Sequence, residues 1–275
     1  MKRLLLVLSA FALVLGSCSK SEDTPVVVDD SGLVENLDNI LIKQIIESNG
    51  TTVTNTTTFT YDGKKIVKTE DTQGKKVVFI YVGSQISKKE SYLNNTLTDV
   101  QKFEYNTDLK LIKYSELNSN LAVQYYENYS YNADYTIIIY KNYNTNYSEG
   151  NSFDGTMTKL ERPVTEKFYH LDFNSLPSYT IDNRLTYTFD AKNSFYKNIT
   201  NYKSIAFAGN KNLNTGVNNN ITKLIKYRKN NDTNDISNIV TNWVYTYKSN
   251  DFPATCVKTV NNNGTTSTTN ITYVY

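Results

Sequence analysis

This 275-residue sequence has few of the side chains on which most enzyme and metal sites depend. It contains one His, two Cys, four Pro and one Trp. With one His and so few thiols, a zinc site of the usual His and Cys ligands cannot form within the chain. A Ser-His-Asp hydrolase would have to use His170, which lies two residues before Asp172. No Gly-x-Ser-x-Gly motif accompanies it, so we interpret His170 as a partly exposed strand residue.

The sequence has no large excess of one charge, since it contains 29 Lys and Arg and 27 Asp and Glu, for a formal net charge of +2. Acids and bases are interspersed, whereas nucleic-acid binding needs a concentrated basic face, so we expect no nucleic-acid partner. No Gly-rich phosphate-binding loop is visible. The Asn- and Asp-rich run 230–235 lacks the Gly and the terminal Glu of a calcium loop. We therefore predict neither a metal nor a cofactor.

The N-terminal apolar run, Leu4–Leu15, is shorter than the roughly 20 residues that span a bilayer. Lys2 and Arg3 precede it, and two small residues and Cys18 follow it. This order resembles the signal and lipobox of bacterial lipoproteins. In that family the signal is removed before the Cys, whose thiol is acylated. The resemblance implies that residues 1–17 are a signal peptide and that Cys18 carries the lipid that holds the protein at a membrane.

The residues after Cys18 also suggest a location. Residues 18–38 are polar and acidic, which is typical of a flexible tether. The charged cluster 20–23 resembles the surface-export signal of Bacteroidetes lipoproteins. We therefore expect a lipid-anchored outer-membrane protein, and the cluster implies exposure at the cell surface. With Cys18 lipidated, Cys256 has no disulfide partner, and its strand-like surroundings predict a buried thiol rather than a nucleophile.

Tyrosine is what the sequence has in abundance, with 23 Tyr against 11 Phe. This composition favours β-strands. The stretch 57–68 is typical of a strand, an Asp62-Gly63 turn and a second strand. Copies of its aromatic–x–aromatic element recur at 59–61, 79–81, 103–105, 129–131, 187–189, 245–247 and 273–275, with a partial copy at 152–155. Intermediate strands are predicted at 65–68, 85–88, 109–114 and 136–140, which indicates a repeat of hairpins.

The aromatic spacing predicts the fold class. Phe59 and Tyr61 share one face of a strand, whereas Thr58 and Thr60 take the other. One apolar face and one wet face are typical of antiparallel sheets. We predict an all-β antiparallel meander of repeated hairpins over 39–275 as a single domain, forming a large coiled sheet, an open barrel or a two-layer sandwich.

Several boundaries are predicted within this meander. The first strand is placed at 40–47, although a short helix near 33–41 fits the apolar positions as well. Hairpin turns are expected at Asn49-Gly50, 230–234 and 261–264. A break is expected near 148–166. A loop is expected at 209–220, with 218–220 at its tip.

One family resemblance covers this region. The run from Tyr61 to Ile66 resembles the YD repeat of Rhs-like proteins, in which a Tyr-Asp pair precedes a Gly turn and an apolar strand. The layout of 40–275 also resembles uncharacterised YD-repeat-like lipoproteins of Bacteroidetes. Most other copies lack the Asp, the Gly or both, and no segment resembles an Rhs toxin domain. The resemblance implies an architecture and a compartment, but no established activity.

The dense tyrosines between 125 and 147 are the candidate binding surface. Tyr125, Tyr129, Tyr131 and Tyr135 could stack on sugar rings or contact a protein partner. The alternative is that they are the sheet's own packing. We predict a non-enzymatic envelope lipoprotein that binds or scaffolds, with a glycan or a protein as its partner.

The alternative function is an envelope glycan hydrolase that uses paired carboxylates. Its candidate acids are Glu104, Glu116, Glu127 and Asp154. The sequence does not place any two of them across a cleft. It also does not identify a ligand.

Overall fold

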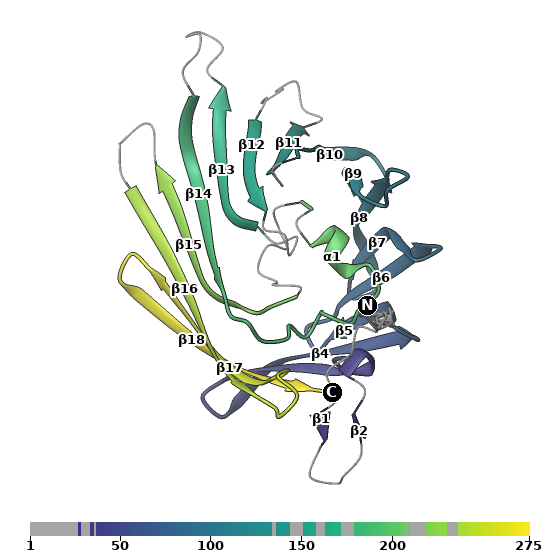
Figure 1. Cartoon of the computed structure of the whole chain (residues 1–275), viewed down its shortest axis with the longest axis vertical. Coiled ribbons are helices and arrows are strands. Elements are labelled where there is room, and N and C mark those ends of the chain that lie inside the picture. The colour runs from purple at the N-terminus through teal and green to yellow at the C-terminus, as the bar shows by residue number, and fades with distance from the viewer. Residues whose placement is uncertain are drawn as a thin grey trace, which may run out of the picture. The chain divides into compact units, whose positions relative to one another are not determined.

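Figure 1 presents a computed structural model of the chain, which divides by its contacts into Met1–Leu37 and Asp38–Tyr275. The structure describes residues 27–28, 34–35, 37–133, 136–143, 151–157, 163–171, 179–206, 208–209, 218–229 and 236–275. At 27–28, 34–35, 136–184, 228–229 and 236–237 it describes the backbone alone. In the first unit, β1 (Val27–Val28) and β2 (Val34–Glu35) form a short antiparallel ladder.

The second unit is an antiparallel meander that follows η1 (Leu37–Asn39). Each strand pairs with the next one in the chain, and β18 pairs with β3, so the strand order is that of a closed barrel. The predicted all-β antiparallel meander is confirmed, whereas the predicted barrel was an open one and the pairing closes the strand order. The strands are β3 (Gln44–Asn49), β4 (Thr52–Asp62), β5 (Lys65–Asp71), β6 (Lys75–Val82), β7 (Gln85–Leu93), β8 (Thr96–Tyr105), β9 (Leu111–Asn118), β10 (Val123–Tyr131), β11 (Thr136–Tyr143), β12 (Asn151–Met157), β13 (Pro163–Leu171), β14 (Tyr179–Phe189), β15 (Ile221–Lys229), β16 (Ile236–Tyr247), β17 (Pro253–Asn262) and β18 (Thr265–Val274).

The aromatic–x–aromatic copies all lie at one end of this barrel. Each full copy ends an even-numbered strand, from Phe59 and Tyr61 on β4 to Tyr273 at the end of β18. Because successive strands run in opposite directions, the C-terminal ends of the even-numbered strands lie at the same rim of the barrel. The partial copy at 152–155 behaves differently. It lies inside β12, where Gly155 pairs with Ile137 of β11 and with Glu166 of β13.

A β-bulge accompanies the repeat in five hairpins. Thr60 pairs with Lys68 and Tyr61 pairs with Ile66, so Val67 is an extra residue on β5. The same shift in register occurs at Ile80/Tyr81, Glu104/Tyr105, Thr188/Phe189 and Thr246/Tyr247. An extra residue reverses the alternation of the strand that carries it. Simple alternation therefore fails on these odd-numbered strands.

The second tyrosine of a repeat also joins neighbouring hairpins. In three copies its hydroxyl donates a hydrogen bond of 2.8 Å to a backbone carbonyl of the preceding hairpin or of the segment before β3. The donor and acceptor residues are Tyr61 and Ile42, Tyr105 and Ile86, and Tyr131 and Leu111. The repeat therefore needs tyrosine here for its hydroxyl as well as for its ring.

The connection between β14 and β15 folds back inside the barrel. We call its described residues 190–206, 208–209 and 218–220 the inner segment; it contains α1 (Tyr202–Ile205). Figure 1 draws α1 within the ring of strands. Thr200 donates a backbone hydrogen bond of 2.9 Å to Lys64, and Gly209 donates one of 2.9 Å to the Glu127 carboxylate. The segment is thus fixed to β10 and to the turn between β4 and β5.

The predicted loop tip at 218–220 is wrong, because these residues belong to the inner segment. Asn220 is 2% exposed, and its side-chain amide donates to Asp190 and to the carbonyl of Asn193. A run of Asn is typical of an exposed turn. Here Asn220 makes tertiary hydrogen bonds instead.

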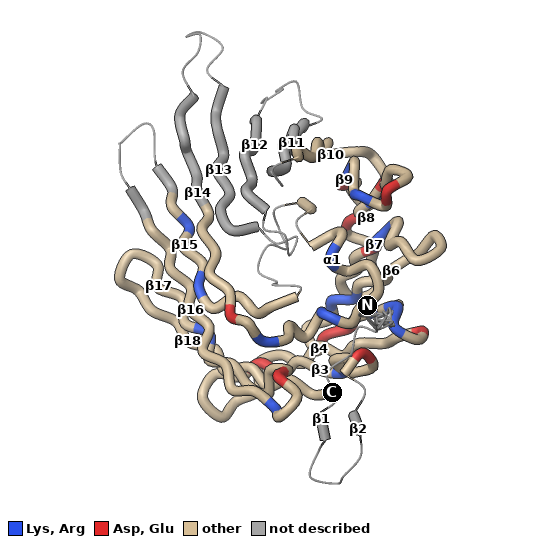
Figure 2. Tube along the Cα trace, viewed as in Figure 1, with Lys and Arg blue, Asp and Glu red and all other residues tan. Residues whose placement is uncertain are grey.

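The two faces of the barrel wall differ sharply. Phe59, Phe79 and Phe103 pack in one cluster with Ile199 and Ile205 of the inner segment, so this face points inward. The opposite face carries exposed Thr and charged side chains. Its ion pairs are Lys68–Glu70 at 2.8 Å, Lys88–Glu90 at 2.7 Å and Lys113–Glu104 at 3.6 Å. Charged residues of both signs follow one another along β4–β9 (Figure 2), and the outer face is the predicted wet one.

The other predicted boundaries agree with the structure only in part. The predicted strand at 40–47 begins only at Gln44, and a 3-10 helix at Leu37–Asn39 precedes it. The turns at Gly50 and Gly264 are confirmed, with φ of +58° and +92°. Strands β12 and β13 occupy much of the predicted break at 148–166, whereas 230–235 lie outside the described residues. Within the described residues, no helix is both long and apolar enough to cross a membrane.

Candidate functional site

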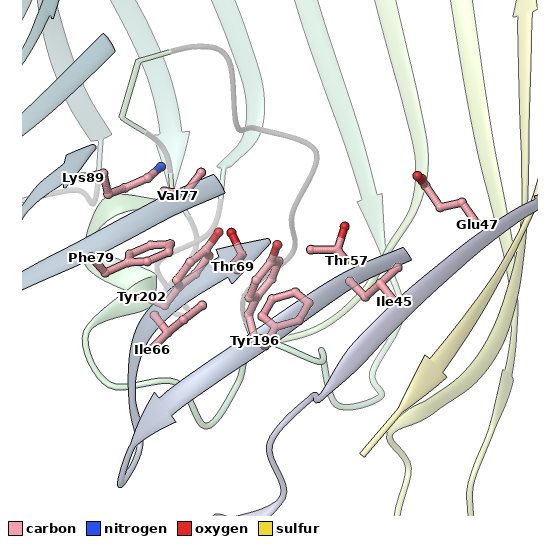
Figure 3. Close-up of a pocket in the computed structure, with 11 residues that line it drawn as sticks. Ile45, Glu47, Thr57, Ile66, Thr69, Val77, Phe79, Lys89, Tyr196 and Tyr202 are labelled. Atoms are coloured by element: carbon pink, nitrogen blue, oxygen red, sulfur yellow. The ribbon is translucent and has the colours of Figure 1, made fainter. Parts of the chain in front are cut away.

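A cavity of about 280 Å³ lies inside the barrel, beside the inner segment. Inner-face residues of β3–β7 form its wall, and two tyrosines of the inner segment complete it (Figure 3). Eleven residues line it: Ile45, Glu47, Thr57, Phe59, Ile66, Thr69, Val77, Phe79, Lys89, Tyr196 and Tyr202. The cavity is thus bounded by repeat residues on one side and by the connection that departs from the repeat on the other.

Tyr196 and Tyr202 form a stacked pair at this boundary. Their ring centroids are 4.2 Å apart and their planes differ by 8°. Burial raises the pKa of both phenols, most strongly for Tyr202. Both hydroxyls therefore remain protonated across the physiological range, and they supply neutral polar groups beside an aromatic surface.

Lys89 is the only cation among the lining side chains. Its position on β7 is opposite Phe79 of β6 and Gln101 of β8, and both neighbours face inward. The residue is only 8% exposed, and burial lowers the pKa of its ammonium to about 8, against the opposing effect of Asp99. Its nitrogen lies 5.7 Å from the centroid of the Phe79 ring.

The Asp99 carboxylate offsets only part of the cost of burying this ammonium. Within the described part of the chain, Lys89 has neither a hydrogen-bond acceptor nor an ion-pair partner. The side-chain oxygen of Gln101 is also buried, and no described residue donates to it. In Figure 3 the nitrogen of Lys89 points toward the other lining side chains. Lys89 in the cavity lining and Gln101, its cross-strand neighbour on β8, therefore both retain unused hydrogen-bonding capacity.

Glu47 is the one acid that lines the cavity. Its carboxylate accepts a hydrogen bond of 3.3 Å from the Asn55 side chain. In Figure 3 it lies at the opposite side of the group from Lys89. The lining therefore combines an apolar body with one cation and one anion that are set apart.

The predicted tyrosine surface lies on β10. The hydroxyls of Tyr125 and Tyr129 donate to the Glu127 carboxylate, and that of Tyr131 donates to a backbone carbonyl. Tyr129 is buried, so the inner packing that was the alternative interpretation describes this group better than an exposed surface does. Tyr135 lies outside the described residues.

The candidate carboxylates are divided between the two faces of the wall, and on the inner face Glu116 and Glu127 both lie near Tyr114. Glu104 lies on the outer face, where it pairs with Lys113, and Glu127 is 1% exposed on the inner face. Glu127 accepts from two tyrosines and from the backbone of Gly209. Glu116 accepts from Tyr114 at 3.3 Å. The side chain of Asp154 is not described.

Among the cysteine and histidine predictions, the structure tests only the one for Cys256. Cys256 is 1% exposed, and burial raises the pKa of its thiol to about 12, so the predicted buried thiol is confirmed. Cys18 and Asp172 lie outside the described residues, and for His170 only the backbone, on β13, is described. In the described part of the chain, no group of three or more His, Cys, Asp or Glu could hold a metal.

Sequence reasoning missed the cavity and Lys89. Lys89 stands between Lys88 and Glu90, so it looks like one of three charges on a solvated strand. The bulge before it turns Lys89 inward, while Lys88 and Glu90 remain outside as an ion pair. The aromatic residues near 195–202, which follow no repeat spacing, were the available signal of a second packing element.

Comparisons with known proteins give a limited result. No family model matches the chain, and no curated protein matches it. Among solved structures, a porin-like protein from Bacteroides uniformis is similar with a TM-score of 0.35 and 14% identity, over 90% of this chain and 88% of that one. A porin-like protein from Bacteroides vulgatus is similar with a TM-score of 0.38 and 12% identity, over 86% of this chain and 98% of that one.

Proposed function

We propose that this chain is a non-catalytic, lipid-anchored protein of the outer membrane whose barrel stands in water and binds a small molecule in its interior. The cavity beside Lys89 is the observation that carries the binding function. The lipobox-like segment ending at Cys18 supports the anchor, and the cluster at 20–23 supports exposure at the cell surface.

The outer face supports a barrel in water. A barrel that crosses a membrane turns an apolar band toward lipid and polar residues inward. Here the arrangement is inverted, with Lys68, Lys88, Lys102 and Lys113 outside and the phenylalanines inside. An outward Lys costs about 2–4 kcal/mol at the middle of a bilayer and less toward its surfaces, so four would cost at most about 8–16 kcal/mol. That is comparable to the whole stability of a typical domain, about 5–15 kcal/mol.

Binding is favoured over hydrolysis by the use of the carboxylates. Glu127 accepts two hydrogen bonds from tyrosines of its own strand, β10, and one from Gly209 of the inner segment, and Glu104 is on the outer face. In contrast, the cavity has the composition of a ligand site, with apolar walls and a few polar groups. The geometry therefore supports retention of a ligand better than general acid and base chemistry.

The anchor is tested by cutting the tether. A site for a sequence-specific protease is inserted between Asp30 and Ser31, and isolated membranes are treated with the protease. We expect the barrel to move to the soluble fraction, because only the lipid on Cys18 holds it. Membranes without the inserted site are the control. A barrel that stays in the pellet after complete cleavage would contradict the water-facing wall.

The binding function is tested by filling the cavity. Thr57 lines it, whereas the adjacent Thr58 is exposed on the outer face, so Thr57→Phe and Thr58→Phe form a matched pair. A collection of small molecules is screened by the rise in melting temperature of the wild-type chain. We expect ligands that stabilise the wild type and Thr58→Phe but not Thr57→Phe. Equal stabilisation of both variants would place binding elsewhere, and an absence of ligands would refute the proposal.

A further inference from the structure

We infer that the cavity takes a small organic monoanion, a carboxylate on an apolar body, with the charged end placed on Lys89. This inference rests on the proposed binding function and specifies the chemical class of its ligand. Three features of the cavity support it: the charge of Lys89, the number of charged side chains in the lining, and the apolar character of the other walls.

The charge of the ligand follows from Lys89. A buried ammonium is unfavourable unless a partner compensates it. On β6 and β8 its cross-strand neighbours are a phenyl ring and an amide, and no described residue forms a hydrogen bond or an ion pair with it, although the Asp99 carboxylate favours its charged form. The Asp99 carboxylate instead accepts from Ser91 at 3.1 Å and from Gln101 at 3.4 Å. An anionic oxygen in the cavity would give Lys89 the charge-assisted hydrogen bond that the protein does not supply.

The ligand carries one negative charge and no more. Lys89 is the one cation of the lining, and Glu47 contributes a negative charge on the other side. A phosphate dianion is usually held by several donors, such as an Arg fork or successive backbone amides. One ammonium matches a carboxylate better, and Glu47 would repel a second charge at the far end.

The body of the ligand follows from the rest of the lining. Five residues of the lining are apolar: Ile45, Phe59, Ile66, Val77 and Phe79. A volume of about 280 Å³ suits one ring with a short side chain. An aryl or short alkyl carboxylate satisfies both the walls and Lys89, whereas a fully hydroxylated body would leave its hydroxyls against apolar side chains.

The test measures binding of charged and neutral analogues to the full-length protein in detergent. Calorimetric titrations use phenylacetate and hexanoate, each with its uncharged amide, at pH 7. The variants are Lys89→Met and, as a matched control, Lys102→Met on the exposed outer face of β8. We expect the wild type and Lys102→Met to bind at least one carboxylate. Binding to Lys89→Met should be weaker by about tenfold or more, and the amides should bind weakly to all three proteins.

Each other outcome overturns the inference. Equal binding of an amide and its carboxylate would remove the role of charge. Undiminished carboxylate binding by Lys89→Met would remove the role of Lys89, which circular dichroism can separate from misfolding. If neither carboxylate binds at millimolar concentration, the ligand class is wrong. The proposed binding function would still stand if the Thr57→Phe screen yields a ligand of another class, and it would fail if that screen yields none.

Discussion

Lys89→Met is expected to make the protein more stable at neutral pH, although it removes the proposed contact with ligand. Lys89 is 8% exposed, it has no hydrogen-bond or ion-pair partner among the described residues, and the Asp99 carboxylate offsets only part of the cost of its burial. Met is similar in length, apolar and flexible enough to fill the same space. The substitution therefore removes the cost of a buried ammonium and leaves the packing against Phe79 largely intact.

The magnitude follows from the pKa of Lys89, which burial lowers from 10.5 to about 8. This difference of about 2.5 units corresponds to about 3 kcal/mol, at about 1.4 kcal/mol per unit. Below pH 8 both the folded and the unfolded state carry the proton, so the folded state bears the whole cost. Between pH 8 and 10.5 the folded state holds fewer protons, so the free energy of unfolding of the wild type rises with pH.

The assay is urea unfolding of the wild type and Lys89→Met between pH 7 and 10.5. We expect Lys89→Met to be more stable by up to about 3 kcal/mol at pH 7, and this advantage to shrink through the upper part of the range. Lys102→Met, on the outer face, should stay within about 0.5 kcal/mol of the wild type throughout. A Lys89→Met protein that is less stable at pH 7, or an advantage that does not change with pH, would refute the reasoning.

Three further substitutions test contacts and backbone conformations elsewhere in the barrel by urea unfolding. Tyr105→Phe keeps the ring but removes the hydroxyl that donates to the Ile86 carbonyl at 2.8 Å, so we expect the free energy of unfolding to fall by about 1 kcal/mol. An unchanged stability would show that this hydrogen bond between hairpins does not stabilise the barrel. Gly209→Ala places a Cβ 2.6 Å from the Tyr114 ring at a φ of +74°, so we expect a loss of about 2 kcal/mol or more, and a neutral result would contradict the close contact. Leu109→Gly relieves a φ of +61° at a 55% exposed side chain, so we expect a gain of up to about 1 kcal/mol, which Leu109→Ala should not reproduce.

The repeat was predictable because its physics is local. Alternation alone placed Phe59 and Tyr61 on one face, and turn chemistry placed Gly63 in a turn, where its φ is +56°. The bulge was not predictable, since Val67 differs in no obvious way from an ordinary strand residue. Its position depends on which residue of β5 is opposite Tyr61, and that pairing is a tertiary property.

The candidate site could not be predicted for the same reason, and the composition of the inner segment was a second reason. Lys89 faces inward only because a bulge shifts its strand, and the charges on either side of it suggest solvent. The inner segment is rich in Asn, which usually indicates an exposed loop. Asn201 instead accepts from the backbone of Ile86 at 2.8 Å, and Asn198 donates to that of Ile40 at 2.9 Å.

These features together account for why the cavity lies where it does. The repeat alone would produce a ring of hairpins with the same inward aromatic residues at every copy, and such a ring has no reason to bind anything in particular. The inner segment breaks that symmetry, because it is fixed by Glu127 on one side and by the turn at Lys64 on another. The tyrosine stack of that segment then faces the cavity walls from β3–β7, and among the residues that line the cavity Lys89 is the one cation. A buried charge that weakens the fold and faces an apolar space is most simply understood as retained for a ligand.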